Sequence, residues 1–314
     1  MSHNVSASST ESFHCKELGY CLTLQYIRGG KLWVLTCCEM HATVFDTTGD
    51  FGRDLEKYKQ TANELSDKLT AGIICGCTRC YRLEKGVGKK NEFKRINLAP
   101  GAPGGELCNF KCIYCYHAKL PVSNKNVCDY NIYDVLCYID KNIDDDEFHI
   151  DYNCGEITVS PLREKILALW NRKKWRGVIL TNASIYCEEI TELLRSGRVK
   201  LNCSLDAGTA ETYYKIKGVD CFNKTVANLR KYAVLDGAVQ LKYILLKDIN
   251  YNEPDIREFI ELCKELNAEV ILSRDYFDCR PGLSVDEMQM FNLFNDLVLE
   301  YNLKLVTDRR VNIS

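Results

Sequence analysis

Beyond residue 92, hydrophobic segments of two kinds alternate along the chain. Short apolar runs predict strands, and longer stretches with an apolar residue every three or four positions predict helices. The predicted strands are 93–98, 147–153, 177–182, 199–205, 239–246 and 269–273, and the predicted helices are 132–142, 161–173, 188–196, 210–216, 222–232, 253–266 and 284–300. This alternation is typical of parallel strands joined by right-handed crossovers. We therefore predict an α/β fold, a partial (βα)6 TIM-like barrel with its chemistry at the carboxyl ends of the strands.

Two of the predicted helices have marked starts. Pro161 suits a first helical turn because its missing N–H has no partner there in any case. Ser284 and Glu287 have the spacing of a capping box. Both signals predict that a helix begins at or just after the marked residue.

The first part of the chain has a different pattern. The runs 22–27 and 32–38 flank Gly29-Gly30 and predict a hairpin, and one amphipathic helix follows at 55–69. The Lys- and Gly-rich stretch 84–90 is typical of a linker. We predict a flexible tail, a small Cys-rich α+β module, a linker, the barrel, and a C-terminal extension of one helix and one strand, with the ranges 1–14, 15–84, 85–92, 93–280 and 281–314.

Composition narrows the function classes. Hydrophobic residues make up 46% of the 314 residues, which excludes a mostly disordered chain. The net charge of −2 supplies no global basic field, so nucleic acid is a disfavoured partner. No apolar run is long enough for a membrane span. The first residues also lack the apolar segment that a secretory signal would have. We therefore expect a cytoplasmic protein without a membrane partner.

The 18 cysteines are the unusual feature of the composition. In a reduced compartment, cysteines at short spacings indicate ligands for a metal or an iron–sulfur cluster. Cys108, Cys112 and Cys115 form the tightest group. Three such thiolates can hold one face of a 4Fe–4S cube and leave the fourth iron open. A zinc knuckle completed by His117 is the alternative.

This CxxxCxxC spacing resembles the signature of the radical S-adenosylmethionine (radical SAM) enzymes, and Tyr114 matches the aromatic residue that usually precedes the last cysteine. The resemblance implies that the open iron chelates S-adenosylmethionine. An electron from the cluster would then cleave the cofactor to a 5′-deoxyadenosyl radical that takes a hydrogen atom from the substrate. The stretch 153–158 resembles the family's GGE motif, so Gly155 and Glu156 would bind the cofactor's ammonium, with Cys154 in place of the first glycine.

The stretch 201–218 resembles a further family segment, "SlDag…etyekirg". The resemblance assigns Ser204 and Asp206 to the cofactor's ribose and carboxylate. A helix N-cap at Asp206 or Thr209 is the alternative. Residues on or directly after the predicted strands are candidates for further cofactor contacts. Cys279, which follows the sixth predicted strand, is a candidate hydrogen donor. The further cofactor candidates are Asn182 and Lys242, and the less favoured donors are Cys203 and Cys221.

The cysteines before the linker need a separate account. We predict that they hold a second 4Fe–4S cluster or a structural zinc, because a module with so few large apolar residues has a thin core. Unliganded thiols are the remaining alternative. The arrangement resembles the SPASM or twitch auxiliary-cluster module, although that module normally follows the barrel. The predicted ligands are Cys37, Cys75, Cys77 and Cys80, and Cys21 is a further candidate.

These features favour a radical SAM enzyme that acts on a peptide, a carbohydrate or a small molecule. An electron donor such as flavodoxin or ferredoxin would reduce the cluster. The alternative class is a non-catalytic zinc or iron–sulfur scaffold or redox sensor. The sequence does not select one reaction that would follow hydrogen abstraction.

Overall fold

The structure is a computed structural model that divides into two compact units. Unit 1 comprises Met1–Pro103 and Pro121–Ile150, and unit 2 comprises Gly104–Leu120 and Asp151–Ser314. We describe each unit by itself. The described residues are 12–27, 31–37, 44–73, 75, 80, 83–88, 90–105, 107–115, 129–275 and 283–307.

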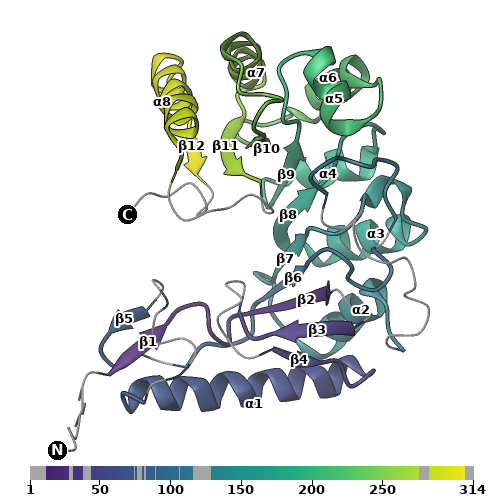
Figure 1. Cartoon of the computed structure of the whole chain (residues 1–314). Helices are drawn as coiled ribbons and strands as arrows, with labels where there is room; N and C mark the ends of the chain where they lie inside the picture. The colour runs from purple at the N-terminus through teal and green to yellow at the C-terminus, as the bar shows by residue number, and fades with distance from the viewer. Residues whose placement is uncertain are drawn as a thin grey trace, which may run out of the picture. The chain divides into compact units, whose positions relative to one another are not determined.

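Unit 1 is built on four neighbouring strands in the order β6-β2-β3-β4 (Figure 1). The predicted hairpin is confirmed, since β2 and β3 pair antiparallel, but β2 also pairs in parallel with β6. The long helix α1 buries the predicted apolar stripe, and Asp50 caps its start. The elements of unit 1 are β1 (Phe13–Cys15), β2 (Cys21–Ile27), β3 (Lys31–Leu35), β4 (Val44–Asp46), α1 (Phe51–Thr70), β5 (Leu83–Lys85), β6 (Arg95–Leu98) and α2 (Ile132–Asn142).

The predicted linker is partly a strand. β5 pairs antiparallel with β1 and places Glu84 opposite His14. The Asn91 amide then donates to the carbonyl oxygens of Cys15 and Leu18, at 2.8 and 2.7 Å. Strand pairing and these side-chain bonds therefore hold the start and the end of this Lys- and Gly-rich stretch. The predicted domain ranges remain predictions.

Unit 2 contains a large parallel sheet in the order β7-β8-β9-β10-β11-β12, in which each pair from β8 to β12 is parallel. The boundary between the units falls within β7. The fold is mixed α/β, as expected from the alternation. The elements are β7 (His149–Tyr152), a 3-10 turn (Ile157–Val159), α3 (Arg163–Lys173), β8 (Arg176–Leu180), α4 (Glu188–Arg195), β9 (Val199–Ser204), α5 (Ala210–Lys217), α6 (Phe222–Tyr232), β10 (Val239–Leu245), α7 (Glu253–Glu265), β11 (Glu269–Arg274), α8 (Val285–Glu300) and β12 (Leu305–Thr307).

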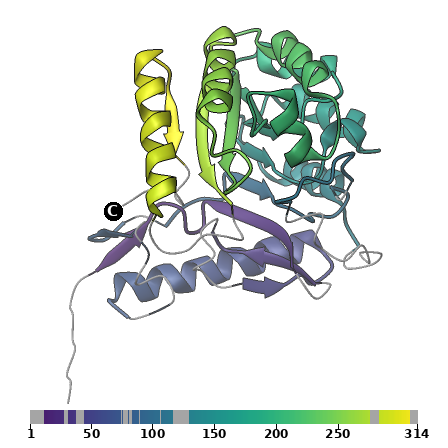
Figure 2. The same ribbon diagram turned by 45° about the horizontal axis from the view of Figure 1, so that its top comes forward.

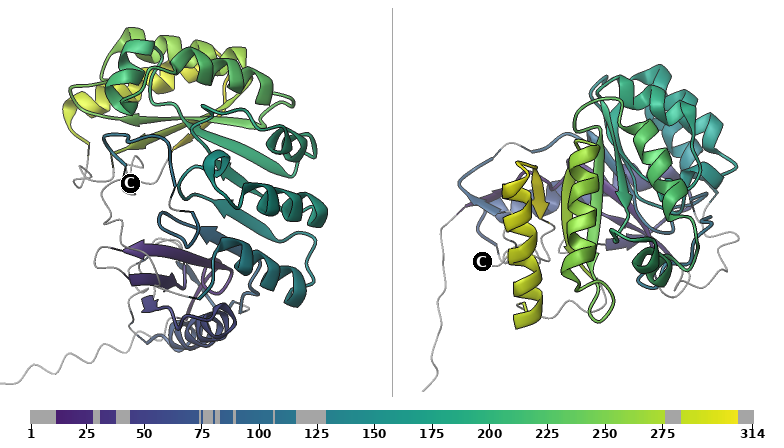
Figure 3. Two further views of the ribbon diagram at one scale, coloured as in Figure 1. Left: turned by 90° about the vertical axis from the view of Figure 1, so that its right-hand side faces the viewer. Right: turned by 90° about the horizontal axis from the view of Figure 1, so that it is seen from above.

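The strands of unit 2 bury one face beneath helices and leave the other partly accessible. Along β9, every second residue is buried and the alternate residues are half-buried, as expected from the two-residue period of a strand. Helices α7 and α8 lie side by side (Figure 2). Helices α3 to α6 connect the successive strands from β7 to β10 (Figure 3). Tyr243, Phe259 and Phe294 form an aromatic cluster between β10, α7 and α8. The face of the strands that the helices do not cover is therefore available to polar side chains.

Local signals at the helix starts had different outcomes. The capping box of Ser284 and Glu287 is confirmed. The helix predicted from Pro161 is present but begins two residues later, at Arg163, and Pro161 lies in the preceding turn. The cap of α5 is the Thr209 hydroxyl, which accepts from the Thr212 N–H. Within the described part of the chain, no helix is both long and apolar enough to cross a bilayer.

Candidate functional site

The three cysteines of the signature lie on one loop of unit 2. We call residues 107–115 the cluster loop. Cys108 is exposed, and Cys112 and Cys115 are half-buried. Partial burial of its sulfur raises the pKa of Cys108 to about 11, and the nearby charges of Cys112 and Cys115 add to the rise. The three thiols are therefore close enough to influence one another electrostatically.

The start of the cluster loop packs tightly against Gly155. The Glu156 N–H donates to the Leu107 carbonyl at 2.7 Å. A Cβ at Gly155 would lie 2.3 Å from the Gly105 carbonyl oxygen and 2.5 Å from that of Leu107, and the residue has a φ of +51°. Both the close approach and the left-handed backbone favour glycine here. Cys154, at the position of the missing glycine, is only 1% exposed and packs inward.

Glu156 is buried with a polar shell supplied by two strand ends. Its Oε1 accepts from the Thr158 N–H at 3.0 Å and from the Thr158 hydroxyl at 2.7 Å. The Thr181 hydroxyl lies 2.8 Å from Oε1 and 3.0 Å from Oε2, and the Asn182 N–H donates to Oε2 at 2.6 Å. Sequence reasoning missed Thr181, because a threonine at a strand end is not a distinctive signal.

Asn182 connects this carboxylate to the cluster loop. Its side-chain amide donates to the side-chain oxygen Oδ1 of Asn109 at 2.8 Å and reaches the Cys108 sulfur at 4.0 Å. The Phe110 N–H also points at that sulfur, at 3.4 Å. The structure therefore brings three predicted site residues together, namely Cys108, Glu156 and Asn182.

Ser204 and Lys242 lie beside each other on adjacent strands. They are register partners on β9 and β10, and both are half-buried. Residues paired in this way project from the same face of a sheet. Within the described part of the chain, the Ser204 hydroxyl makes no hydrogen bond. The face that carries these two side chains is therefore suited to a polar ligand.

Asp206 is more deeply buried than its predicted role requires. It is inaccessible to solvent and has a φ of +61°. Its Oδ1 accepts from the Ile244 N–H at 2.8 Å, and its Oδ2 accepts from the Tyr114 hydroxyl and the Lys217 ammonium, both at 2.5 Å. Both oxygens of this carboxylate are therefore engaged by the protein. Sequence reasoning assigned no role to Lys217.

The turn after Asp206 is fixed by α7. The Asp255 carboxylate accepts from the backbone N–H groups of Gly208 and Thr209, each at 2.9 Å, and from the Tyr243 hydroxyl at 2.9 Å. A Cβ at Gly208 would lie 2.0 Å from the Asp255 carbonyl oxygen. This close approach fits the glycine of the family-like segment, but Asp255 itself could not be predicted from local pattern.

The cluster loop fits a thiolate-ligated cluster by the chemistry of its donors. Three thiols share one loop, and N–H groups of Phe110 and Asn182 point toward the Cys108 sulfur. Hydrogen bonds to ligand sulfurs are typical of iron–sulfur sites. Within the described residues, no three His, Cys, Asp or Glu side chains form a group that could hold a single metal ion.

A cavity of about 170 Å³ lies beside the cluster loop in unit 2. Ile113 and Tyr114 form one side, and the segments after β10 and β11 form the other. Arg274 and Glu287 make an ion pair of 2.8 Å at its edge. The cavity therefore combines an apolar wall with a charged rim next to the candidate ligands.

The predicted ligands of unit 1 have apolar surroundings. Cys37 and Cys75 pack with Cys15 around Leu18, Ala62, Leu65 and Leu69, which form a small hydrophobic cluster. Cys80 is half-buried, and Cys21 is buried in β2. Three residues named as ligands or donors, Cys77, His117 and Cys279, lie outside the described residues.

The other candidate hydrogen donors differ in burial. Cys203 is almost fully buried in β9, and burial raises its pKa far above the ordinary range. Cys221 is half-buried and lies 3.9 Å from the Tyr213 hydroxyl. The burial of Cys203 favours a packing role over hydrogen donation.

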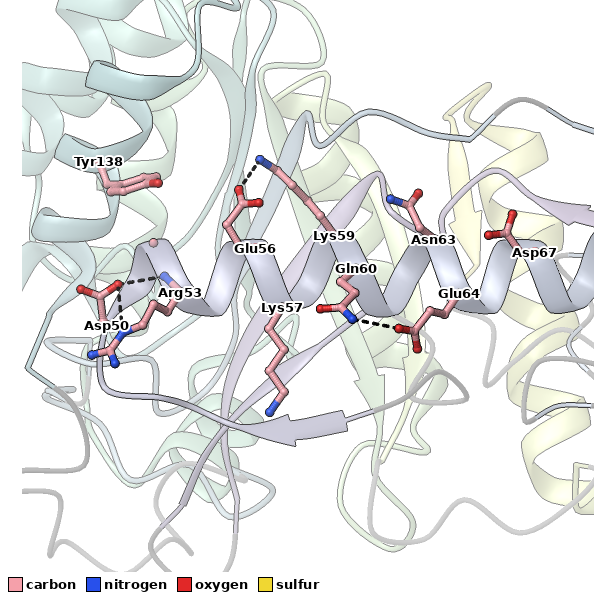
Figure 4. Close-up of a pocket in the computed structure, with 11 residues that line it drawn as sticks. Asp50, Arg53, Glu56, Lys57, Lys59, Gln60, Asn63, Glu64, Asp67 and Tyr138 are labelled. Carbon is pink, nitrogen blue, oxygen red and sulfur yellow. Dashed lines mark hydrogen bonds and ion pairs between the residues drawn. The ribbon is translucent and has the colours of Figure 1, made fainter.

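A wider hollow of about 980 Å³ runs along α1 in unit 1 (Figure 4). Its charged and polar side chains pair largely with one another. Lys59 donates to Glu56 at 2.9 Å, and Gln60 donates to Glu64 at 3.1 Å. These pairs lie on the helix surface and do not converge on a ligand, so we do not assign the candidate site to this hollow.

Comparison with known proteins gives relatives but no matching family model. The chain is 26% identical over 184 residues to GTP 3′,8-cyclase of Aliarcobacter butzleri, and 26% identical over 185 residues to a probable GTP 3′,8-cyclase of Saccharolobus islandicus. These matches cover 57% and 59% of this chain and 54% and 56% of the relatives. The chain therefore spans about half the length of the curated relatives it matches.

Solved structures extend the likeness in fold. SuiB of Streptococcus suis bound to its precursor peptide SuiA superposes with a TM-score of 0.52, and SuiB bound to S-adenosylmethionine with a TM-score of 0.51. The identities are 12% and 11%, and each alignment covers 94% of this chain and 72% of SuiB. At this level of identity the likeness concerns the fold.

Proposed function

We infer that this chain, a member of the radical SAM superfamily, cleaves S-adenosylmethionine reductively at a 4Fe–4S cluster and abstracts hydrogen from a substrate. The observation that carries this proposal is the convergence of the cluster loop, Glu156 and Asn182 at one end of the parallel sheet. The carboxyl ends of parallel strands are the usual place for chemistry in such folds.

In this proposal, Cys108, Cys112 and Cys115 ligate the cluster. When bound, the cluster and S-adenosylmethionine would supply the electron transfer and the hydrogen abstraction. The protein's part is to hold the three thiolates, to orient the cofactor and to keep water away from it. Gly155 contributes by letting the backbone before Cys108 approach the end of β7.

Glu156 retains capacity for a cofactor ammonium. Thr181 has one hydroxyl proton and can donate to only one of the two carboxylate oxygens at a time. When it donates to Oε1, the Asn182 N–H is the one donor to Oε2 among the described residues, and Oε2 can take a further donor. We therefore assign Glu156 to the ammonium, with Thr181 and Asn182 fixing its orientation.

In this proposal, side chains on the accessible face of β9 and β10 make the remaining cofactor contacts. We assign Ser204 to the ribose and Lys242 to the carboxylate of S-adenosylmethionine, because the two side chains project from the same face. Asp206 is a weaker candidate for direct contact, since both of its oxygens accept hydrogen bonds from the protein. Its part in the proposal is to hold Tyr114.

Substrate and partners belong to the same proposal. A peptide substrate is supported by the likeness to SuiB bound to SuiA, and a carbohydrate or small molecule remains admissible. The cavity beside Ile113 and Tyr114 is the place we assign to the adenosyl group or the part of the substrate that meets it. Flavodoxin or ferredoxin would supply the electron in the cytoplasm.

We also propose that unit 1 holds a second metal–sulfur site, a 4Fe–4S cluster or zinc. The predicted ligands are Cys37, Cys75, Cys77 and Cys80, and the packing of Cys15 beside Cys37 and Cys75 adds it to the candidates. An auxiliary role like that of a SPASM module is part of this proposal. We also propose that the parallel strands curve into a partial (βα)6 barrel. Cys279 is the proposed hydrogen donor.

The proposal is tested with anaerobically reconstituted protein, S-adenosylmethionine and a chemical reductant. The wild-type chain should bind about four irons at the cluster loop and release 5′-deoxyadenosine and methionine. Cys112→Ala should reduce that release to the level of the reductant alone. Cys137→Ala, a half-buried cysteine of α2, is the matched control and should cleave the cofactor like wild type. Unchanged cleavage by Cys112→Ala contradicts the proposal, as does zinc alone in the wild-type chain.

A further inference from the structure

Lys217 is a fully buried cation at the C-terminal end of α5. Only 2% of the residue is exposed. Its ammonium donates to Asp206 Oδ2 at 2.5 Å, to the Ser204 carbonyl oxygen at 2.6 Å and to the Tyr114 hydroxyl at 2.7 Å. A lysine ammonium has three N–H donors, so these contacts can use all of them. Such an arrangement is rare, because lysine is almost never fully buried unless it is paired.

These contacts attach the cluster loop to two strand ends. Tyr114 belongs to the loop, and its hydroxyl also donates to Asp206 at 2.5 Å. The Ile113 N–H donates to the Ile216 carbonyl oxygen at 3.1 Å, so the backbone beside Tyr114 is bound to the same end of α5. Lys217 therefore joins the loop to the end of β9, and Asp206 extends the link to Ile244 on β10.

The charge of Lys217 lies against the cluster loop between two candidate ligands. Burial, the largest single influence, would lower the pKa of Lys217, but the neighbouring negative groups, Asp206 first among them, together hold that pKa above its usual value. The residue therefore carries a positive charge at neutral pH. Its partner Tyr114 stands two residues after Cys112 and directly before Cys115. Removing the cation while Asp206 remains would therefore leave an unbalanced negative charge beside these ligands.

We propose that Lys217 is a positioning residue that fixes the cluster loop through Tyr114 and raises the reduction potential of the cluster ligated by Cys112. This inference rests on the proposed function, since it requires a cluster at the three cysteines. Reduction adds one negative charge to a cluster. A fixed positive charge nearby stabilises the reduced form, and low solvent access keeps the interaction strong.

The test is the reduction potential of the reconstituted cluster, measured without S-adenosylmethionine by redox titration followed by electron paramagnetic resonance. Lys217→Met should disfavour reduction by about tenfold, which is about 59 mV more negative for one electron. Lys215→Met is the matched control, since Lys215 lies on the same helix but is exposed and pairs with Glu211 at 2.7 Å. Its potential should equal that of wild type.

Two further variants separate charge from positioning. Lys217→Arg keeps the charge and should recover most of the potential lost in Lys217→Met. Tyr114→Phe keeps the charge but removes the hydroxyl link, so its potential should stay near that of wild type while iron is lost faster to a chelator. If Lys217→Met does not fold, Lys217→Gln removes the charge and keeps a polar side chain at the same place. That variant should shift the potential in the same direction.

The outcomes are distinguishable from failure of the proposed function. If wild-type protein binds no cluster, the proposed function fails before Lys217 is tested. If wild-type protein binds a cluster, and folded Lys217→Met or Lys217→Gln has the potential of Lys215→Met, the inference about Lys217 is overturned. A potential that falls equally in Lys217→Arg and Lys217→Met overturns the part assigned to charge.

Discussion

The cluster loop of unit 2 and the cysteines of unit 1 place the same residue type in opposite surroundings. In unit 2, Cys108 faces N–H donors from Phe110 and Asn182, and the Lys217–Asp206 ion pair is bonded to the same loop through Tyr114. In unit 1, Cys37 packs with Cys15, Cys75 and the leucines of α1 in a hydrophobic cluster. Spacing alone predicts metal ligands in both groups, but their surroundings differ.

The difference teaches what a redox site requires beyond thiols. Hydrogen bonds and nearby charges adjust the potential of a cluster, and the cluster loop has both. A structural metal site requires mainly that the ligands be held near one another. In unit 1, the predicted ligands Cys37 and Cys75 pack in one hydrophobic cluster. We therefore expect substitutions near the cluster loop to alter redox behaviour, and substitutions in unit 1 to alter metal content and stability.

The largest expected effect comes from Gly155→Ala. The new Cβ would meet the carbonyl oxygens of Gly105 and Leu107 at 2.3 and 2.5 Å, so the start of the cluster loop must move away. Most of the iron at the cluster loop should be lost, and unfolding should become easier by at least about 3 kcal/mol. Iron analysis after anaerobic reconstitution and chemical denaturation measure the two effects.

Gly197→Ala is the matched control for this substitution. Gly197 has a φ of +69°, but a Cβ there would meet no atom within 4 Å. The variant should therefore show only the cost of a left-handed alanine, about 1–2 kcal/mol, with full iron content. Equal losses of iron in the two variants would show that backbone strain, and not the close approach to the cluster loop, determines the result.

Sequence reasoning predicted features that depend on neighbouring residues better than features that depend on residues far apart in the chain. The helices and strands beyond residue 92 were predicted to within a few residues, because periodicity and caps are local signals. Gly155 and Glu156 could be predicted as cofactor contacts because their motif is contiguous. Lys217 could not, because a lysine on a short helix usually indicates a solvated face, and only the tertiary fold places it against Asp206.

Longer-range features of unit 1 were missed for the same reason. The parallel pairing of β2 with β6 joins segments far apart in the chain, and neither segment carries a mark of its partner. The short strand β5 lies in a Lys- and Gly-rich stretch, and composition favoured a linker there. In both cases the pairing partner, not the local sequence, determines the structure.

A smaller effect is expected from Cys37→Ala. If unit 1 holds a second metal, this variant should lose the metal bound beyond the four irons of the cluster loop, and it should still cleave S-adenosylmethionine. Loss of the buried sulfur should also cost about 1 kcal/mol of stability. Metal analysis of iron and zinc per chain is the measurement, with Cys137→Ala as the control. An unchanged metal content would leave apolar packing as the role of Cys37.

The smallest expected effect is a difference between the two groups of thiols in how their alkylation rate depends on pH. It is measured on metal-free, reduced protein. The pKa of Cys108 is raised to about 11, chiefly by burial of its sulfur, so its reactive thiolate is scarce at neutral pH. Its alkylation rate should rise about tenfold per pH unit from pH 7 to 10, since each unit below the pKa changes the thiolate fraction tenfold.

Cys37 should behave differently because it is only 6% exposed and must be uncovered before it reacts. In the open form its thiol has the ordinary pKa of about 8.5, so alkylation should level off above about pH 9 and increase with mild denaturant. Mass spectrometry of the labelled peptides follows both cysteines in one sample. If both profiles level off near pH 9, the cluster loop does not keep Cys108 protonated, and the electrostatic contrast between the two groups of thiols disappears.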